Sequence, residues 1–288
     1  MRNTFINYLI KKARIDESVC LIVGDLGFNV IEPFQDEFPD RFINAGISEQ
    51  NMASMAAGMA SEGYKVFIYS IANFPTFRCA EQIRNDICYH NFDVTIVAVG
   101  GGLAYGNLGY SHHAIQDYGL MRLFPEISIV SPGDPNEVEK CMDFVFKDTS
   151  PKYLRLRKAG EERITDYQNH LSPGNWQPIE INDPKKILLT TGYGLKIAKD
   201  LLCKNKYKDY SIYSCPIWGM KYADQQIKNQ NFFDKIIIVE DHLKSGGFGS
   251  WLTENISKNE DKINFFCIKN TVIGEVGSED YLLKNNLQ

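Results

Sequence analysis

The chain has 288 residues, of which 44% are hydrophobic and 23% are charged. This length favours two ordinary α/β domains, and the apolar content is enough to build their cores. The 31 basic and 36 acidic residues leave a net charge of −5 and form no long block of one sign, which argues against binding to nucleic acid or to an anionic membrane surface. Small molecules and other proteins are therefore the expected partners.

Cysteine usage and apolar runs indicate the compartment. The seven cysteines are widely spread and include no Cys-x-x-Cys pair, so we expect buried reduced thiols rather than disulfides or zinc ligands. Residues 1–16 have the pattern of an amphipathic helix instead of the continuous apolar core of a signal peptide. No run reaches the roughly 18 apolar residues of a membrane span. We expect a cytoplasmic protein that does not contact membranes.

Strands and helices alternate along the first half of the chain. Patterns that predict strands lie in residues 19–23, 41–45, 64–71, 93–99, 127–131 and 151–157. Patterns that predict helices lie in residues 1–16, 47–63, 77–90, 112–125 and 135–146. The segment 72–77, which contains Pro75, is predicted to be a loop. Such alternation is typical of a parallel, doubly wound sheet.

A polar, turn-rich stretch interrupts the alternation after residue 160, and the alternation resumes at Lys185. We therefore predict two doubly wound, mostly parallel α/β domains, residues 1–160 and 185–288, joined by a linker over 161–184. Strands of the second domain are predicted in 185–191, 210–218, 234–242 and 263–270, with helices in 197–206 and 250–256 and a short tail.

The stretch 41–63 changes from strand to helix at Ala45-Gly46 and places Glu49 near the start of the helix. A carboxylate there lies at the carboxyl edge of the sheet, where open α/β folds bind their ligands. A glutamate that only caps the helix, or that makes a hydrogen bond at an interface, is the alternative. Apolar and small residues surround the helix on every side, so we expect it to be buried all round, against a second subunit.

Other polar positions also lie at predicted strand ends. Asp25 follows the first strand, where an ordinary turn or cap is the alternative to a binding role. The glycines 100–102 indicate unusual torsions or a close approach by another group. Arg155 and Arg157 alternate with apolar residues as on one face of an edge-like strand. His112-His113 lies in a glycine-rich loop, where a ligand contact is favoured over a core role.

The order of these motifs resembles the pyrimidine-binding and carboxyl-terminal domains of transketolase. The resemblance rests on GDLG (24–27), FINAGISEQNM (42–52), NFPTF (73–77), the loop ending in SHH (111–113), VSPGDPNE (130–137) and GGFGSWL (246–252). The family's diphosphate-binding half carries Gly-Asp-Gly and a downstream asparagine, and neither Gly24-Asp25-Leu26 nor Gly133-Asp134-Pro135 fits that motif. The chain thus resembles one subunit of a split transketolase.

The resemblance implies thiamine diphosphate as cofactor and assigns residues to its aminopyrimidine. Glu49 matches the carboxyl group that hydrogen-bonds N1′ and promotes the imino tautomer, which acts as the base at C2 of the thiazolium. Phe74 matches the aromatic residue that stacks on the pyrimidine, and Phe77 falls where a second ring lines the pocket. Asp25 matches a position near the pyrimidine. Ordinary core phenylalanines are the alternative for both rings.

The resemblance also implies a substrate site. Asn29 and His112 match sugar-binding positions, and His113 stands where the family usually has glutamine. Lys158, or else one of the arginines on the same strand, matches a phosphate-binding cation, although an exposed strand charge is equally plausible. Leu108 and the region of Gly100 replace residues that contact sugar hydroxyls in the family, which argues against the usual pentose phosphates.

Together these features predict a transketolase-type transferase that moves a two-carbon ketol unit from a ketose to an aldehyde. A partner chain would hold the diphosphate and its Mg²⁺ or Ca²⁺, in an assembly of two copies of each chain, and this chain would self-associate through its first domain. The alternatives are a 2-oxo acid dehydrogenase beta subunit, a deoxyxylulose-phosphate-synthase-like enzyme, and a non-catalytic relative that keeps only the fold.

Overall fold

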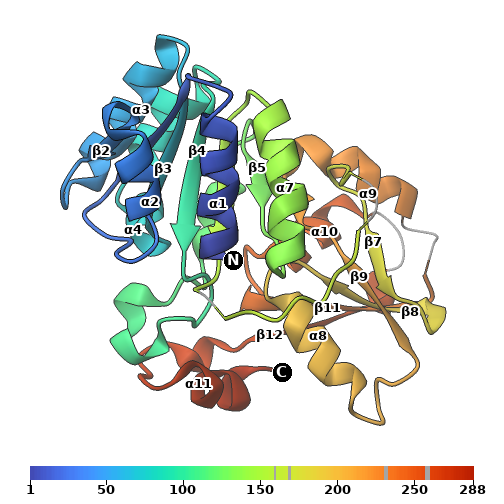
Figure 1. The fold of residues 1–288 in the computed structure, drawn as a ribbon. Helices are drawn as coiled ribbons and strands as arrows, with labels where there is room; N and C mark the ends of the chain where they lie inside the picture. The colour runs from blue at the N-terminus through green and yellow to red at the C-terminus, as the bar shows by residue number, and fades with distance from the viewer. Residues whose placement is uncertain (159, 168–169, 230–232, 257–259) are drawn as a thin grey trace.

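The computed structural model describes residues 1–158, 160–167, 170–229, 233–256 and 260–288 (Figure 1). The first sheet has the strand order β10-β5-β6-β4-β3-β1-β2. Its strands are parallel except β10, which runs antiparallel to β5. They are β1 (Val19–Val23), β2 (Phe42–Asn44), β3 (Lys65–Ile71), β4 (Val94–Val99), β5 (Ser128–Val130), β6 (Lys152–Leu156) and β10 (Ile217–Trp218).

The second sheet has the order β12-β11-β8-β9-β7 and is parallel except for β7. Its strands are β7 (Gln177–Glu180), β8 (Asp183–Thr190), β9 (Tyr210–Ser214), β11 (Lys235–Leu243) and β12 (Ile263–Ile268). The central strands are continuous runs of branched apolar residues, as expected where helices cover both faces of a parallel sheet. The predicted α/β class with two mostly parallel sheets is confirmed.

Helices cover both faces of the first sheet. On one face lie α1 (Arg2–Ala13), α2 (Glu32–Glu37) and α7 (Pro135–Lys147), packed through buried apolar side chains such as Phe5 and Met142 (Figure 1). The other face carries α3 (Glu49–Ser61), followed along the chain by α4 (Asn73–Phe77), α5 (Ala80–Gln82), the π-helical turn η2 (Ile83–Cys88) and α6 (Asp117–Met121). Short 3₁₀ turns are η1 (Pro39–Arg41), η3 (Gly106–Leu108) and η4 (Tyr110–His112).

Helices α8 (Gly194–Leu202) and α10 (Phe248–Asn255) cover opposite faces of the second sheet. The remaining elements of this half are α9 (Ala223–Asn229), α11 (Glu279–Asn286), η5 (Met220–Tyr222), η6 (Glu260–Lys262) and η7 (Asn270–Val272). Among the residues that the structure describes, no helix combines the length and the apolar character that a membrane crossing requires. All seven cysteines are unpaired, and all but Cys203 are buried.

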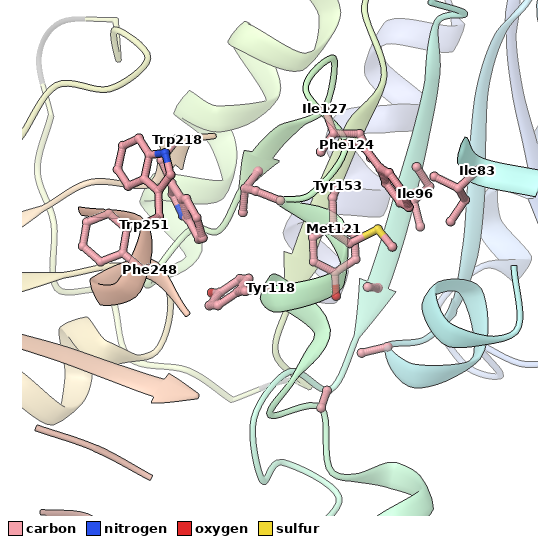
Figure 2. Close-up of a cluster of buried hydrophobic side chains, with 14 of the residues drawn as sticks. Ile83, Ile96, Tyr118, Met121, Phe124, Ile127, Tyr153, Trp218, Phe248 and Trp251 are labelled. Atoms are coloured by element: carbon pink, nitrogen blue, oxygen red, sulfur yellow. The ribbon is translucent and has the colours of Figure 1, made fainter. Parts of the chain in front are cut away.

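One aromatic cluster joins the two sheets (Figure 2). The Trp218 ring centroid lies 5.2 Å from those of Tyr118 and Phe248 and 5.3 Å from that of Trp251. Because Trp218 belongs to β10, the predicted strand 210–218 is in fact divided. Its first part, β9, pairs in the second sheet and its last part crosses to the first. The two halves of the chain therefore share a core.

Three predictions about local structure were wrong. Strand β6, which contains Arg155 and ends just before Arg157, lies between β5 and β4 rather than at an edge, and both arginines pair with the buried Asp241. The expected linker 161–184 includes β7 and the start of β8, which belong to the second sheet. The expected loop 72–77 contains helix α4, since Pro75 lies within the first turn, where a missing N–H costs no hydrogen bond.

The predicted burial of α3 on all sides is not found within the chain. Met52, Ala53, Ala56 and Ala57 are buried, but the opposite side is exposed. The exposed residues are Gln50, Asn51, Ser54, Gly58 and Ser61. The small side chains therefore form a free surface, which leaves the predicted contact with a second subunit as a proposal.

Candidate functional site

Glu49 is the first residue of α3 and lies beside the carboxyl end of β1. Its side chain is 5% exposed, and a Cβ atom added to Gly24 would lie 3.6 Å from its Cγ. The Ser48 hydroxyl donates a 2.6 Å hydrogen bond to the Ala45 carbonyl oxygen, which holds the turn before the helix. The sequence thus folds the carboxylate into the edge of the sheet, as predicted.

Arg78 connects Glu49 to Phe74. Its Nη1 donates a 2.9 Å hydrogen bond to Glu49 Oε1, and its Cζ lies over the Phe74 ring, 4.2 Å from the centroid. The Phe74 ring in turn lies 5.2 Å from the His112 ring at an angle of 71°. These four side chains therefore form one continuous group, although they come from three separate parts of the sequence.

The histidine loop is fastened to α4. Asn73 Nδ2 donates 3.1 Å hydrogen bonds to the carbonyl oxygens of Ser111 and His113. His112 is half-buried, and its Nδ1 lies 3.0 Å from Ser111 Oγ. Desolvation by burial, together with the charges of His113 and Arg78, lowers the pKa of His112 from its ordinary 6.5. The imidazole is therefore neutral at neutral pH and can both donate and accept hydrogen bonds.

The other predicted site residues lie around this group with different degrees of exposure. Phe77 is 46% exposed and belongs to the same short helix as Phe74. Asp25 and Asn29 are exposed and adopt positive φ angles of 53° and 63°, which are uncommon outside glycine. Asp25 Oδ1 accepts a 3.0 Å hydrogen bond from Asn44.

His113 and Asn29 make hydrogen bonds to residues outside this group. His113 is buried, and its Nε2 lies 3.2 Å from the Gly106 carbonyl oxygen, so a substrate would reach it only if the loop moved. The Asn29 backbone N–H donates a 2.8 Å hydrogen bond to Glu32 Oε1, and no hydrogen bond or ring contact among the described residues joins Asn29 to Phe74 or His112. Their substrate roles remain predictions.

The three candidate phosphate-binding cations differ sharply. Arg155 is buried and bonded to Asp117 and Asp241, while Arg157 is bonded to Asp241 and Glu279. Lys158 is half-buried, makes no ion pair with any residue that the structure describes, and holds its Nζ 4.7 Å from the Tyr105 ring centroid. The alternative of exposed strand charges is wrong for both arginines.

Lys158 also lines a cavity of about 290 Å³ with Tyr193 and Lys196. The Tyr105 ring beneath Lys158 lies 6.4 Å from the His112 ring. Arg157 lines the same cavity with Glu161, Glu162 and Glu279, so the cavity does not by itself single out Lys158. Lys158 differs from the two arginines in that no ion pair joins it to a described residue, and it lies one aromatic ring away from His112.

The missing side chains of glycines 100–102 leave room for the buried ion pair of Arg155 and Asp241. Gly100 and Gly102 have φ angles of +83° and +67°. A Cβ atom added to Gly101 would lie 2.6 Å from Arg155 Nε, and one added to Gly102 would lie 2.1 Å from Asp241 Oδ2. The expected unusual torsions and close approach are both confirmed, and their reason is the junction between the two sheets.

Sequence reasoning missed several residues of the site. Arg78 follows Phe74 by four residues, a spacing that places side chains together on a helix, and this was the available signal. The sequence offered no comparable signal for Asn73 or Tyr105. The expected short tail in fact forms helix α11, which lies beside the histidine loop (Figure 1). Leu282 of this helix packs in one cluster with Leu103 and Ile115, and the Gly277 backbone N–H donates to the Gly106 carbonyl oxygen.

The arrangement can bind a planar heteroaromatic ring. A buried carboxylate is available for a ring N–H, an aromatic side chain for a ring face, and a neutral imidazole for hydroxyl groups nearby. Within the described ranges no group of three or more histidine, cysteine, aspartate or glutamate side chains is placed to hold a metal ion.

Comparisons with known proteins agree with this chemistry. Residues 1–160 match the family model described as "Transketolase, pyrimidine binding domain". One of the subunits of apulose-4-phosphate transketolase from Actinobacillus succinogenes is 32% identical over 236 residues, which cover 80% of this chain and 74% of that protein. The 1-deoxy-D-xylulose-5-phosphate synthase of Clostridium perfringens is 30% identical over 99% of this chain, which spans 46% of that enzyme.

A solved structure described as "Split gene transketolase, inactive beta4 tetramer" has the same fold. Its TM-score is 0.81 at 24% sequence identity, with 98% of this chain and 92% of that chain covered. The family match spans more than half of the chain and includes Glu49, Phe74, Arg78 and His112. The chain belongs to the transketolase family and corresponds to the half that begins with the pyrimidine-binding domain.

Proposed function

We propose that this chain is the pyrimidine-binding subunit of a thiamine-diphosphate-dependent transketolase. It would transfer a two-carbon ketol unit from a ketose to an aldehyde acceptor. The observation that carries the proposal is that Glu49, Phe74 and His112 lie in one group at the carboxyl edge of the sheet. These residues fit the aminopyrimidine half of the cofactor, since they supply a buried carboxylate and an aromatic face.

When bound, thiamine diphosphate supplies the nucleophilic carbon that carries the two-carbon unit. Glu49 would hold the proton at the pyrimidine N1′, and Phe74 would stack on the ring and exclude water. The neutral imidazole of His112 would hydrogen-bond the donor hydroxyls and relay their protons. Lys158 would bind a substrate phosphate as a point charge.

The diphosphate and its Mg²⁺ or Ca²⁺ would be held by a separate partner chain. The lack of a fitting Gly-Asp-Gly motif with a downstream asparagine in the sequence motivates this part of the proposal, and the relative from Actinobacillus succinogenes is itself named as a subunit. We propose two copies of each chain in the cytoplasm, with this chain self-associating through the exposed side of α3.

Reconstitution tests the proposal. The purified chain is expected to show no ketol transfer and little cofactor binding, and both are expected to appear when the diphosphate-binding partner is added. Ketol transfer by the chain alone would contradict the split arrangement. A panel of phosphorylated and unphosphorylated ketose donors, assayed with wild type and Lys158→Ala, would identify the substrate class.

A second candidate function is condensation that starts from a 2-oxo acid, as in the related synthase that is 30% identical over 99% of this chain. Release of carbon dioxide from pyruvate by the reconstituted complex would favour it over ketol transfer. Unchanged turnover in Glu49→Gln would instead favour a relative in which this chain has no catalytic role.

A further inference from the structure

Arg78 has no role in the function proposed above, yet it touches both residues assigned to the cofactor ring. One N–H of its guanidinium donates to Glu49 Oε1 at 2.9 Å, and the guanidinium carbon lies 4.2 Å from the Phe74 ring centroid. Glu49 and Phe74 are thus already engaged by a side chain of their own chain.

These contacts resemble those expected of the aminopyrimidine itself. A guanidinium is a planar, delocalised cation whose N–H groups match a carboxylate and whose face stacks on aromatic rings. A pyrimidine bound through N1′ would likewise place an N–H at Glu49 and its ring face on Phe74. Two planar groups cannot occupy one position, so the cofactor ring and the guanidinium compete for the same two contacts.

Arg78 can leave this position at small cost. Its side chain is 49% exposed, whereas the Glu49 side chain is 5% exposed. Neighbouring acidic side chains do not hold it elsewhere, because within the described part of the chain it forms an ion pair with Glu49 alone. The Arg78 end of the pair is exposed and its cation–π contact is weak, so the arginine can rotate into solvent once another donor pairs with the buried Glu49 carboxylate.

We propose that Arg78 is a built-in competitor of the cofactor ring that keeps the buried Glu49 carboxylate paired until the aminopyrimidine displaces it. This inference rests on the proposed function, since it takes thiamine diphosphate as the ligand. The competition reduces the apparent affinity by the fraction of molecules in which Arg78 is away from the site. Removing Arg78 should therefore strengthen cofactor binding rather than weaken it.

The test is calorimetric titration of thiamine diphosphate with Mg²⁺ into the complex of this chain and its partner. Arg78→Gln is expected to lower the Kd roughly three- to tenfold, the effect of losing one weak ion pair and one stacking contact. Arg78→Lys keeps the charge without the planar group and should fall between wild type and Arg78→Gln. Arg84→Gln is the matched control, because Arg84 is exposed and its side chain donates a hydrogen bond to its neighbour Asn85.

The outcomes distinguish a failure of the Arg78 competition from a failure of the proposed function. Two results would overturn the competition. In the first, the Kd of Arg78→Gln equals that of the Arg84→Gln control. In the second, the Kd of Arg78→Gln is higher than that of the control, while Arg78→Lys binds like wild type. Tight cofactor binding by wild type that Glu49→Gln weakens would still support the proposed function in that case. If neither wild type nor any variant binds the cofactor, the proposed function fails and this inference fails with it. Circular dichroism of each variant confirms that the chain is folded.

Discussion

Arg78 and Arg155 make similar contacts in very different surroundings. Each pairs with carboxylate groups and lies over an aromatic ring, Phe74 at 4.2 Å and Tyr118 at 4.4 Å. The Arg155 side chain is 2% exposed and bonded to Asp117, Asp241, Tyr118 and a backbone carbonyl oxygen. The Arg78 side chain is 49% exposed and pairs with the single carboxylate of Glu49 among the described residues.

The difference separates a structural site from a functional one. The donors of Arg155 are engaged in a network that joins the two sheets, so moving it would leave buried charges unpaired. Arg78 lies at an open edge where a ligand can take over its contacts. The buried ion pairs around Arg155 are therefore a fixed part of this molecule. The half-exposed contacts of Arg78 are the part that can exchange partners.

The largest expected effect is on catalysis at the open edge. Glu49→Gln removes the carboxylate that the cofactor ring needs, so turnover of the reconstituted complex should fall by about 10²–10⁴-fold. The thermal unfolding of the chain should change little, since glutamine can accept the Arg78 hydrogen bond. Glu62→Gln, at the exposed end of the same helix, is the control and should keep full activity.

The next effect is on stability at the buried junction. Arg155→Met leaves the buried Asp117 without its arginine and leaves Asp241 with only the longer contact to Arg157, which should lower the free energy of unfolding by about 3–5 kcal/mol. Urea unfolding measures this loss. Arg78→Met breaks a half-exposed pair and should cost far less; equal losses at the two arginines would contradict the distinction drawn between the sites.

A smaller effect concerns acid stability. His242 is buried beside Asp117, and desolvation lowers its pKa from 6.5. Below about pH 6.5 the unfolded chain binds a proton that the folded chain excludes, so stability falls as the pH falls toward the folded pKa, by at most ~1.4 kcal/mol per pH unit. His242→Gln should reduce that slope in urea unfolding between about pH 7 and about pH 5. The same substitution at the exposed His90 is the control.

The smallest effect on the stability of the folded chain is expected for substitutions on the exposed side of α3. Gly58 is exposed, and a Cβ atom there would meet no atom within 4 Å, so Gly58→Arg should leave the chain folded and at least as stable. If this side is the self-association surface, sedimentation should show a smaller assembly. An unchanged assembly would rule this surface out.

The sequence was informative where a feature depended on neighbouring residues. The strand-to-helix turn placed Glu49 at the sheet edge because the apolar run, the glycine and the helical pattern are contiguous. The glycines 100–102 revealed a close approach because only a missing side chain permits one. The placement of Phe74 near His112 could be expected from family resemblance but not from spacing.

Features that depend on distant partners could not be predicted. Arg155 and Arg157 alternate with apolar residues, a pattern that an exposed edge strand shares, and the acids that bury them come from residues 117, 241 and 279. The crossing of β10 to the first sheet depends on Trp218 finding its aromatic partners. The packing of α11 beneath the histidine loop likewise joins segments far apart in the sequence.

A structure of the reconstituted complex with thiamine diphosphate tests the central claim most directly. We expect the aminopyrimidine ring on Phe74, N1′ within hydrogen-bond distance of the Glu49 carboxylate, and the Arg78 guanidinium displaced from both. A cofactor bound away from Glu49, with the Arg78 pair intact, would contradict that claim.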